Sequence, residues 1–252
     1  MRSNFKLIRE NSKYLLETYR FRLIMLFLIC FNIYGTGYLT TNETYIDGIL
    51  VILTNGYYIV SMLAMFLINT INTIDMYENN IFYIIRFKNR KEYLLQLIKN
   101  VIISNLILFF INILVLLIGM NVFVNNFVLE NILDYSIPNV VYLLFYLLRM
   151  MVLIQMISVI SLLIIKLFNV KISIIANIII WLFIMVSPYN MGAVVNSILD
   201  MHIFISDYFR LHLYSGFILE VLCSTIYITI LLIISYIMFY ITKNKMRQIG
   251  GL

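Results

Sequence analysis

The sequence predicts an all-α integral membrane protein with six transmembrane helices in a single domain that covers residues 1–252. Of the 252 residues, 63% are hydrophobic and 12% are charged, whereas a soluble domain is roughly half apolar and a quarter charged. Six apolar windows approach the length of about 20 residues that a spanning helix needs. Basic residues gather in alternate connections between these windows, as expected for a chain that crosses a membrane repeatedly.

The N-terminal residues 1–22 predict the first element, a cytoplasmic amphipathic helix. Apolar residues recur near helical spacing among basic residues: Phe5, Ile8, Leu15 and Tyr19. This pattern is typical of a helix that lies in the membrane interface. The alternative is a charged leader without such a helix. No small-residue cleavage site follows, so we expect the segment to be retained.

The six predicted spans follow in order. They cover residues 23–39, 49–71, 101–120, 140–165, 172–186 and 215–241. The fifth window is short, and Pro188 and Gly192 follow it. Because proline and glycine interrupt helices, we expect a re-entrant outer segment over 188–214, between spans five and six.

The charges distinguish the two sides of the predicted bundle. All 18 basic residues except Arg149 and Arg210 lie before the first window, between the second and third, between the fourth and fifth, or after the sixth. The opposite connections carry acids: Glu43, Asp47, Glu130, Asp134, Asp200 and Asp207. The positive-inside rule then predicts that both termini are cytoplasmic. The frequent Ile, Asn, Lys and Tyr residues are typical of an AT-rich bacterial genome, so we expect the bacterial cell membrane.

The longest cytoplasmic connection, 73–100, is a candidate coupling segment. It begins with acids, continues through an apolar patch at 81–85, and passes through a basic cluster into the third span. Such a segment is expected to form a rigid elbow that a soluble partner can push. The residues expected to contact that partner are Glu78, Ile81, Phe82, Arg86, Lys88, Arg90 and Lys91. The alternative is that the basic residues only determine topology.

In these features the chain resembles the type-2 family of ABC transporter membrane subunits, and in particular the small peptide-exporter and immunity members of Gram-positive bacteria. The likeness lies in the six-span topology and in an elbow that carries Glu78, the basic run 86–90, and Glu92. The resemblance implies an interfacial N-terminal helix, a coupling segment that docks on an ATPase, and the re-entrant outer segment.

The resemblance also implies a function. It predicts the permease subunit of an ATP-driven exporter that moves an amphipathic, antimicrobial or toxin peptide out of the cell or membrane, with a lipid or lipid-linked sugar as the other substrate class. None of the nine glycines begins a phosphate-binding Gly-x4-Gly-Lys-Ser/Thr pattern, so ATP and Mg²⁺ would bind to separate ATPase subunits and the chain itself needs no cofactor. The expected partners are those ATPases, a second copy or homologous subunit, and membrane lipid, but no nucleic acid.

Two ionisable residues, Arg149 and Glu220, lie inside the predicted spans. At about 1.5 Å per residue, they lie roughly 14 Å and 9 Å below the outer ends of spans four and six. An arginine side chain can bridge that difference, which predicts an intramembrane ion pair that could contact substrate or act as a gate. The alternative is that Arg149 snorkels to the interface.

Other polar residues in the spans predict contacts between helices or with the interface. Amides there usually bond to neighbouring helices: Asn55, Asn69, Asn105, Asn112, Gln155 and Asn177. Tyrosines near the outer ends are interpreted as an aromatic belt rather than as residues that stack on substrate: Tyr38, Tyr57, Tyr58, Tyr142, Tyr189, Tyr208 and Tyr214.

Three other function classes have weaker support in the sequence. An enzyme would need clustered catalytic groups, but only His202 and His212 with Asp200 and Asp207 could form an outer metal site. Their spacing matches no catalytic arrangement, so we predict no catalytic residue and no metal. An ion-coupled secondary transporter usually has repeats and buried acids, whereas this chain has one such acid and no detectable repeat. A non-transporting membrane binder, immunity protein or sensor could share the same fold.

Overall fold

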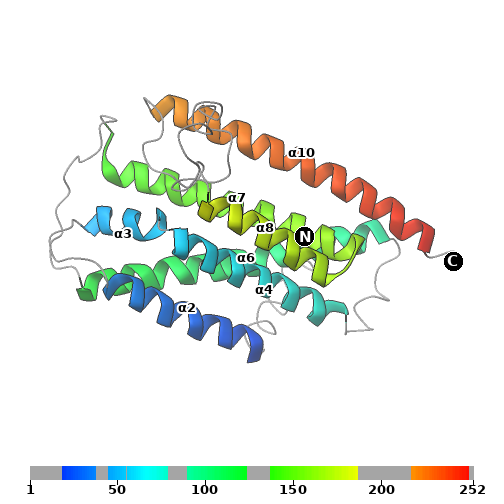
Figure 1. Cartoon of the computed structure of the whole chain (residues 1–252), viewed down its shortest axis with the longest axis horizontal. Helices are drawn as coiled ribbons and strands as arrows, with labels where there is room; N and C mark the ends of the chain where they lie inside the picture. Colours follow the sequence, from blue (N-terminus) through cyan, green and yellow to red (C-terminus); the bar gives the residue numbers. More distant parts are fainter. Residues whose placement is uncertain are drawn as a thin grey trace, which may run out of the picture.

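The computed structural model describes residues 19–37, 45–54, 56–78, 90–123, 137–186 and 217–249. Within these ranges the regular structure is entirely helical, as Figure 1 shows. The helices are α2 (Tyr19–Gly37), α3 (Tyr45–Thr54), α4 (Gly56–Glu78), α6 (Arg90–Phe123), α7 (Asn139–Leu167), α8 (Val170–Val186) and α10 (Phe217–Ile249). The predicted all-α class is therefore confirmed for the described part of the chain.

Four of the described helices are long and apolar enough to cross a membrane. Their candidate spans are Tyr58–Glu78, Lys91–Val122, Val140–Leu167 and Glu220–Lys245, and α8 adds a shorter apolar stretch, Val170–Ile179. Length and composition thus support a membrane protein. The six-span topology with both ends in the cytoplasm stays a prediction, as does the bacterial cell membrane as the location.

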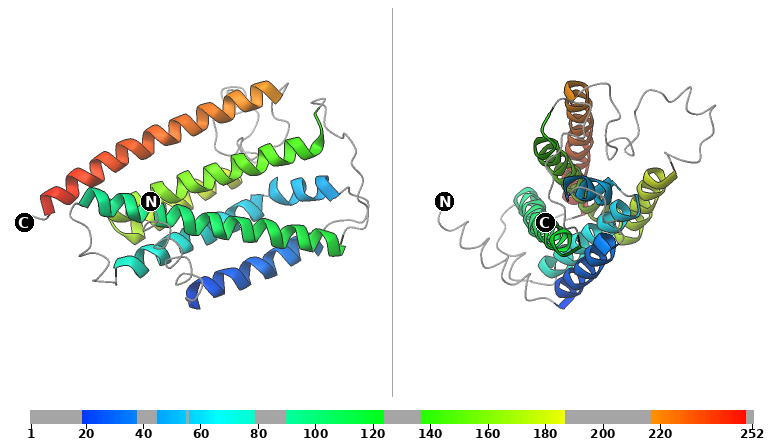
Figure 2. Two further views of the ribbon diagram at one scale, coloured as in Figure 1. Left: turned by 180° about the vertical axis from the view of Figure 1, so that it is seen from behind. Right: turned by 90° about the vertical axis from the view of Figure 1, so that its left-hand side faces the viewer.

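The helices run side by side along the long axis of the molecule, as the two views in Figure 2 show. Helices α4, α6 and α7 form the centre, because each contacts the other two. Helix α2 packs on α6 and α4, α8 packs on α7 and α4, and α10 packs mainly on α7. The span in α10 is only 11% buried, compared with 61% for the span in α7. Helix α10 is therefore peripheral, and most of its apolar surface faces outward.

Alternate helices point in opposite directions, so the basic residues meet at one end of the bundle. The starts of α6 and α8 and the ends of α4, α7 and α10 lie toward the right of Figure 1, and α2 starts nearer its middle, below α4. Ion pairs between Arg20 and Asp75, and between Lys166 and Glu78, join these ends. We call this the basic end and the other the opposite end. The positive-inside rule predicts that the basic end is cytoplasmic.

The second predicted span folds as two helices rather than one. Helix α3 ends at Thr54 and α4 begins at Gly56. Residue 55, between the two helices, lies outside the described residues.

The predicted segments at the helix ends are only partly described. Residues 73–78 continue α4 and residues 90–100 begin α6, so both ends of the coupling segment are extensions of central helices. Residues 19–22 belong to the same continuous helix as the first apolar window. The rest of the predicted interfacial helix, residues 79–89 of the coupling segment, and the predicted re-entrant segment 188–214 lie outside the described residues.

Candidate functional site: a buried arginine–glutamate pair

Arg149 and Glu220 form a buried ion pair between α7 and α10, near the opposite end. The Arg149 Nη1 atom donates to Glu220 Oε1 at 2.6 Å, and the two side chains are only 2% and 1% exposed. Glu220 lies in the first turn of α10, where the helix dipole favours a negative charge. The structure thus brings together the two residues that the sequence suggested as a pair, and Arg149 does not extend to the surface of the described structure.

Tyr142 adds a second donor to the same carboxylate oxygen. Its hydroxyl donates to Glu220 Oε1 at 2.9 Å. Tyr142 precedes Arg149 by seven residues, about two helical turns, so both side chains lie on the face of α7 that meets α10. Because Tyr142 is fully buried, the prediction that it belongs to an aromatic belt is wrong.

Aromatic rings surround the ion pair. The Arg149 Cζ atom lies 5.0 Å from the ring centroid of Tyr146 and 5.8 Å from that of Phe145, within the range of cation–π attraction. Phe217 of α10 packs against Phe145 with 5.1 Å between centroids, and against Tyr142 with 6.4 Å. We call Tyr142, Phe145, Tyr146 and Phe217 the aromatic box. None of the four came from a motif, and the spacing of Tyr142, Phe145 and Tyr146 along α7 becomes informative only once Arg149 is known to be paired.

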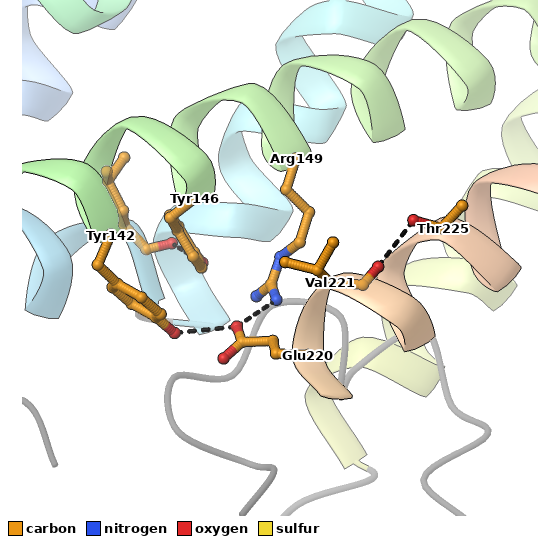
Figure 3. A network of polar contacts seen from close by, with 7 residues as sticks. Tyr142, Tyr146, Arg149, Glu220, Val221 and Thr225 are labelled. Atoms are coloured by element: carbon orange, nitrogen blue, oxygen red, sulfur yellow. Dashed lines mark hydrogen bonds and ion pairs between the residues drawn. The ribbon is translucent and has the colours of Figure 1, made fainter. Parts of the chain in front are cut away.

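The second carboxylate oxygen of Glu220, Oε2, differs from Oε1 in its hydrogen bonding. Glu220 Oε2 is buried and has no hydrogen-bond partner in the described structure. Figure 3 shows it pointing away from Tyr142 and Arg149, while Oε1 receives both donors. A buried acceptor without a donor costs about 1–3 kcal/mol, and more when it is charged. The site therefore has unused capacity to accept a hydrogen bond.

Three further polar networks connect the central helices. Between α2, α4 and α6, Tyr58 donates to Asn32 at 2.9 Å and Asn112 donates to Tyr58 at 2.9 Å. Between α4 and α6, Asn69 donates to Ser104 and to Asn105, both at 2.7 Å. Between α7 and α8, Asn177 donates to Ser161 at 2.9 Å.

These networks confirm the predicted interhelical bonds of Asn69, Asn105, Asn112 and Asn177. Tyr58 is buried among them, so the belt prediction is wrong for it too. Asn32 was not predicted, although its signal was a lone amide in the first apolar window. Gln155 is the exception: it is buried, and neither of its amide atoms has a hydrogen-bond partner in the described structure. Asn55 and the other predicted belt tyrosines fall where no side chain is described.

Glu78, the first of the predicted coupling residues, ties three helices together at the basic end. Glu78 is the last residue of α4, and its carboxylate forms an ion pair with Lys166 near the end of α7. The Tyr93 hydroxyl, in the first turn of α6, donates to the same Glu78 oxygen at 3.4 Å. The Lys166 ammonium also lies 5.9 Å from the ring centroid of Tyr93. The sequence indicated Lys166 only as a topology signal and did not predict this contact.

The other predicted coupling residues have different outcomes. Arg90 begins α6 and Lys91 follows it with an exposed side chain. Ile81, Phe82, Arg86 and Lys88 lie outside the described residues, so their contact with a partner stays a prediction.

Two further contacts stabilise the basic end. Arg20 of α2 pairs with Asp75 of α4 at 3.1 Å, and both side chains are exposed. Lys245 Nζ of α10 donates to the Leu167 carbonyl at 2.6 Å, which satisfies an unpaired carbonyl at the end of α7 and complements its dipole.

The described residues contain no group of three or more His, Cys, Asp or Glu side chains that could hold a metal ion. His202, His212, Asp200 and Asp207 lie outside the described ranges. Comparisons of the chain with known protein families, with curated proteins and with solved structures find no match.

Proposed function

We propose that this chain is the membrane-spanning permease subunit of an exporter driven by a separate ATPase, and that it moves an amphipathic peptide out of the cell or membrane. Two copies, or one copy and a homologous subunit, would form the path, and ATP and Mg²⁺ would bind to the partner. The chain itself would carry out no chemical step.

The observation that supports this proposal is the three-helix contact at Glu78. The coupling segment leaves α4 at Glu78 and returns at the start of α6, and Lys166 joins the same carboxylate to the end of α7. Force applied to residues 79–89 would therefore reach the three central helices together. A flexible loop attached to a single helix would not transmit force in this way.

Helix α7 provides a route from the basic end to the buried pair. It contains 29 residues in one continuous helix, which corresponds to about 44 Å. Lys166 lies near one end of it, and Arg149 and Tyr142 lie toward the other. Under this proposal, closure of the ATPases moves the coupling segment, α7 tilts, and the contact of α7 with α10 changes at the opposite end.

The test is a mild-detergent purification of the tagged chain from its native host, followed by mass spectrometry and an ATPase assay. We expect a stoichiometric nucleotide-binding protein that is lost when Glu78→Gln, Arg86→Gln and Arg90→Gln are combined. The matched control combines Lys171→Gln with Lys243→Gln, which removes charge from the basic end outside the coupling segment and should retain the partner. A pure chain without ATPase activity would contradict the proposal.

An ion-coupled secondary transporter is the second candidate, and Glu220 is the observation that favours it. Its carboxylate is buried and one of its oxygens has no partner in the described structure, which is typical of a coupling group in such carriers. Uptake into proteoliposomes that contain only this chain, driven by a proton or sodium gradient, would support the carrier and contradict the exporter.

A further inference from the structure

The surroundings of Glu220 have the composition of a cation-binding site. Aromatic faces and a carboxylate together attract ammonium and guanidinium groups, most strongly where water is excluded. The aromatic box supplies the rings, and Glu220 supplies the carboxylate at 0% exposure. The cation present in this structure is the protein's own Arg149.

Glu220 has the capacity to bind a second cation. An ionised carboxylate can accept about four hydrogen bonds, and the two donors observed here, Arg149 and Tyr142, both use Oε1. Oε2 is buried with no partner in the described structure. A carboxylate that bridges two basic groups is an arrangement that proteins do bury, as in Arg–Glu–Arg triads.

The neighbouring surface indicates what else the ligand carries. Ile218 and Leu222, two residues before and after Glu220 and therefore on the opposite, outward face of α10, are 77% and 55% exposed. Helix α10 is also the least buried of the four candidate spans, and access to Oε2 would require α10 to move away from α7. An amphipathic ligand that lies along α10 would contact apolar side chains on the outward face, and its cationic group would reach the carboxylate only along the contact between α10 and α7.

We propose that Glu220 Oε2 binds the cationic group of an amphipathic ligand, an ammonium or guanidinium attached to an apolar chain or to a peptide, so that Glu220 bridges this group and Arg149. The aromatic box excludes water from the bridge, and the apolar part of the ligand lies along the contact between α7 and α10. This inference rests on the proposed export function only for the ligand's role as substrate, because binding itself requires no ATPase.

The test uses the full-length chain in nanodiscs of zwitterionic phosphatidylcholine and two probes of similar size and shape, the cation octylguanidinium and the neutral N-octylurea. Calorimetry against empty discs measures binding to each. We expect octylguanidinium to bind about tenfold or more tightly than N-octylurea, as a charge-assisted hydrogen bond predicts. Equal binding of the two probes by the unmodified chain would overturn the proposal, since it would mean partition of the octyl chain alone.

Variants locate the binding. Glu220→Gln should abolish the preference for octylguanidinium. Because that change leaves Arg149 buried without a counter-charge, the combined variant Arg149→Met with Glu220→Met, which removes both charges, serves as the folded alternative and should also show no preference. Thr229→Val, on the exposed face of α10, retains the carboxylate and its surroundings and should retain the preference. A preference that persists in the combined variant would place the cation elsewhere and overturn the proposal.

The result of the cation-binding test can be distinguished from the result of the test for an ATPase partner. Loss of the ATPase partner with intact cation preference would contradict the exporter and leave the site, whereas an ATPase partner without any cation preference would retain the exporter and remove the site.

Discussion

Two ion pairs at opposite ends of α7 join it to its neighbours in different surroundings. Arg149 and Glu220 are 2% and 1% exposed and have aromatic rings and a tyrosine hydroxyl around them. Lys166 and Glu78, at the basic end, are 11% and 42% exposed. One ion pair is thus buried away from solvent, whereas the other is partly exposed.

The difference teaches where each pair can act. A buried pair is strongly destabilised when one partner is lost, because the remaining charge is left without compensation. A partly exposed pair contributes little to stability, because water and salt already screen it. We infer that the buried pair holds α10 on α7, whereas the pair at the basic end can exchange its partner at low energetic cost.

The largest expected effect is on the buried pair. Arg149→Met leaves the Glu220 carboxylate buried beside Tyr142 without a counter-charge, so we expect a loss of about 3–5 kcal/mol of unfolding free energy. The combined change Arg149→Met with Glu220→Met should restore most of it, because apolar replacement of a whole buried pair is often neutral. Reversible unfolding in mixed micelles measures both. Equal losses in the single and combined variants would show that charge burial is not what makes the pair critical.

A smaller effect is expected for the polar network between α2, α4 and α6. Asn112→Leu removes the bonds of Asn112 to Tyr58 and to Asn32, but leaves the bond between Tyr58 and Asn32 at 2.9 Å. Hydrogen bonds between membrane helices contribute about 0.6 kcal/mol on average and at most about 1.7. We therefore expect a loss of about 1 kcal/mol in the same unfolding assay. Leu114→Ala, at a residue of α6 that is 56% exposed, is the control and should cost less.

The sequence predicted positions along the helices better than the directions in which side chains point. Hydropathy located the four described helices that are long and apolar enough to span a membrane, and a count of residues predicted that Arg149 and Glu220 lie near enough to pair. Tyr58 and Tyr142 were misjudged because these spans are apolar all round, so no periodic pattern tells the inner face from the outer one. In such helices a tyrosine near the end suits a belt and a buried network equally well until its neighbours are known.

The contact at Glu78 was beyond sequence reasoning for a different reason. Glu78 and Lys166 end two helices that are far apart in the sequence, and the charge pattern assigns both only to the same side of the membrane. Which of the many basic residues on that side meets Glu78 depends on how α4 and α7 pack. That packing is set by buried apolar residues such as Ile74 and Leu162. Because these side chains resemble one another, the sequence does not indicate which of them pack together.

Lys166→Met tests the partly exposed pair of Lys166 with Glu78 and compares it with the buried pair of Arg149 with Glu220. Because Glu78 can turn to water, we expect the unfolding free energy to fall by no more than about 1 kcal/mol. If Glu78 transmits force under the proposed function, transport per ATP hydrolysed should fall severalfold while ATPase binding is retained. A large loss of stability with normal transport would reverse the roles assigned to the two pairs.

The smallest effect is expected for Arg20 and Asp75, which extend the comparison to a pair that is 66% and 42% exposed. Arg20→Ala should change the unfolding free energy by less than about 0.5 kcal/mol, because exposed pairs gain little and are screened. Even that change should vanish between about 0.05 M and 0.5 M salt, as the Debye length shortens to a few ångströms. Arg22→Ala, an exposed neighbour on the same helix, controls for loss of charge alone.

The response of stability to salt distinguishes the three ion pairs, since the buried Arg149–Glu220 pair should be insensitive to salt. A salt-insensitive Arg20 effect would mean that α2 is held at the basic end by packing of the arginine stem, and exposure would then not be the variable that distinguishes the pairs.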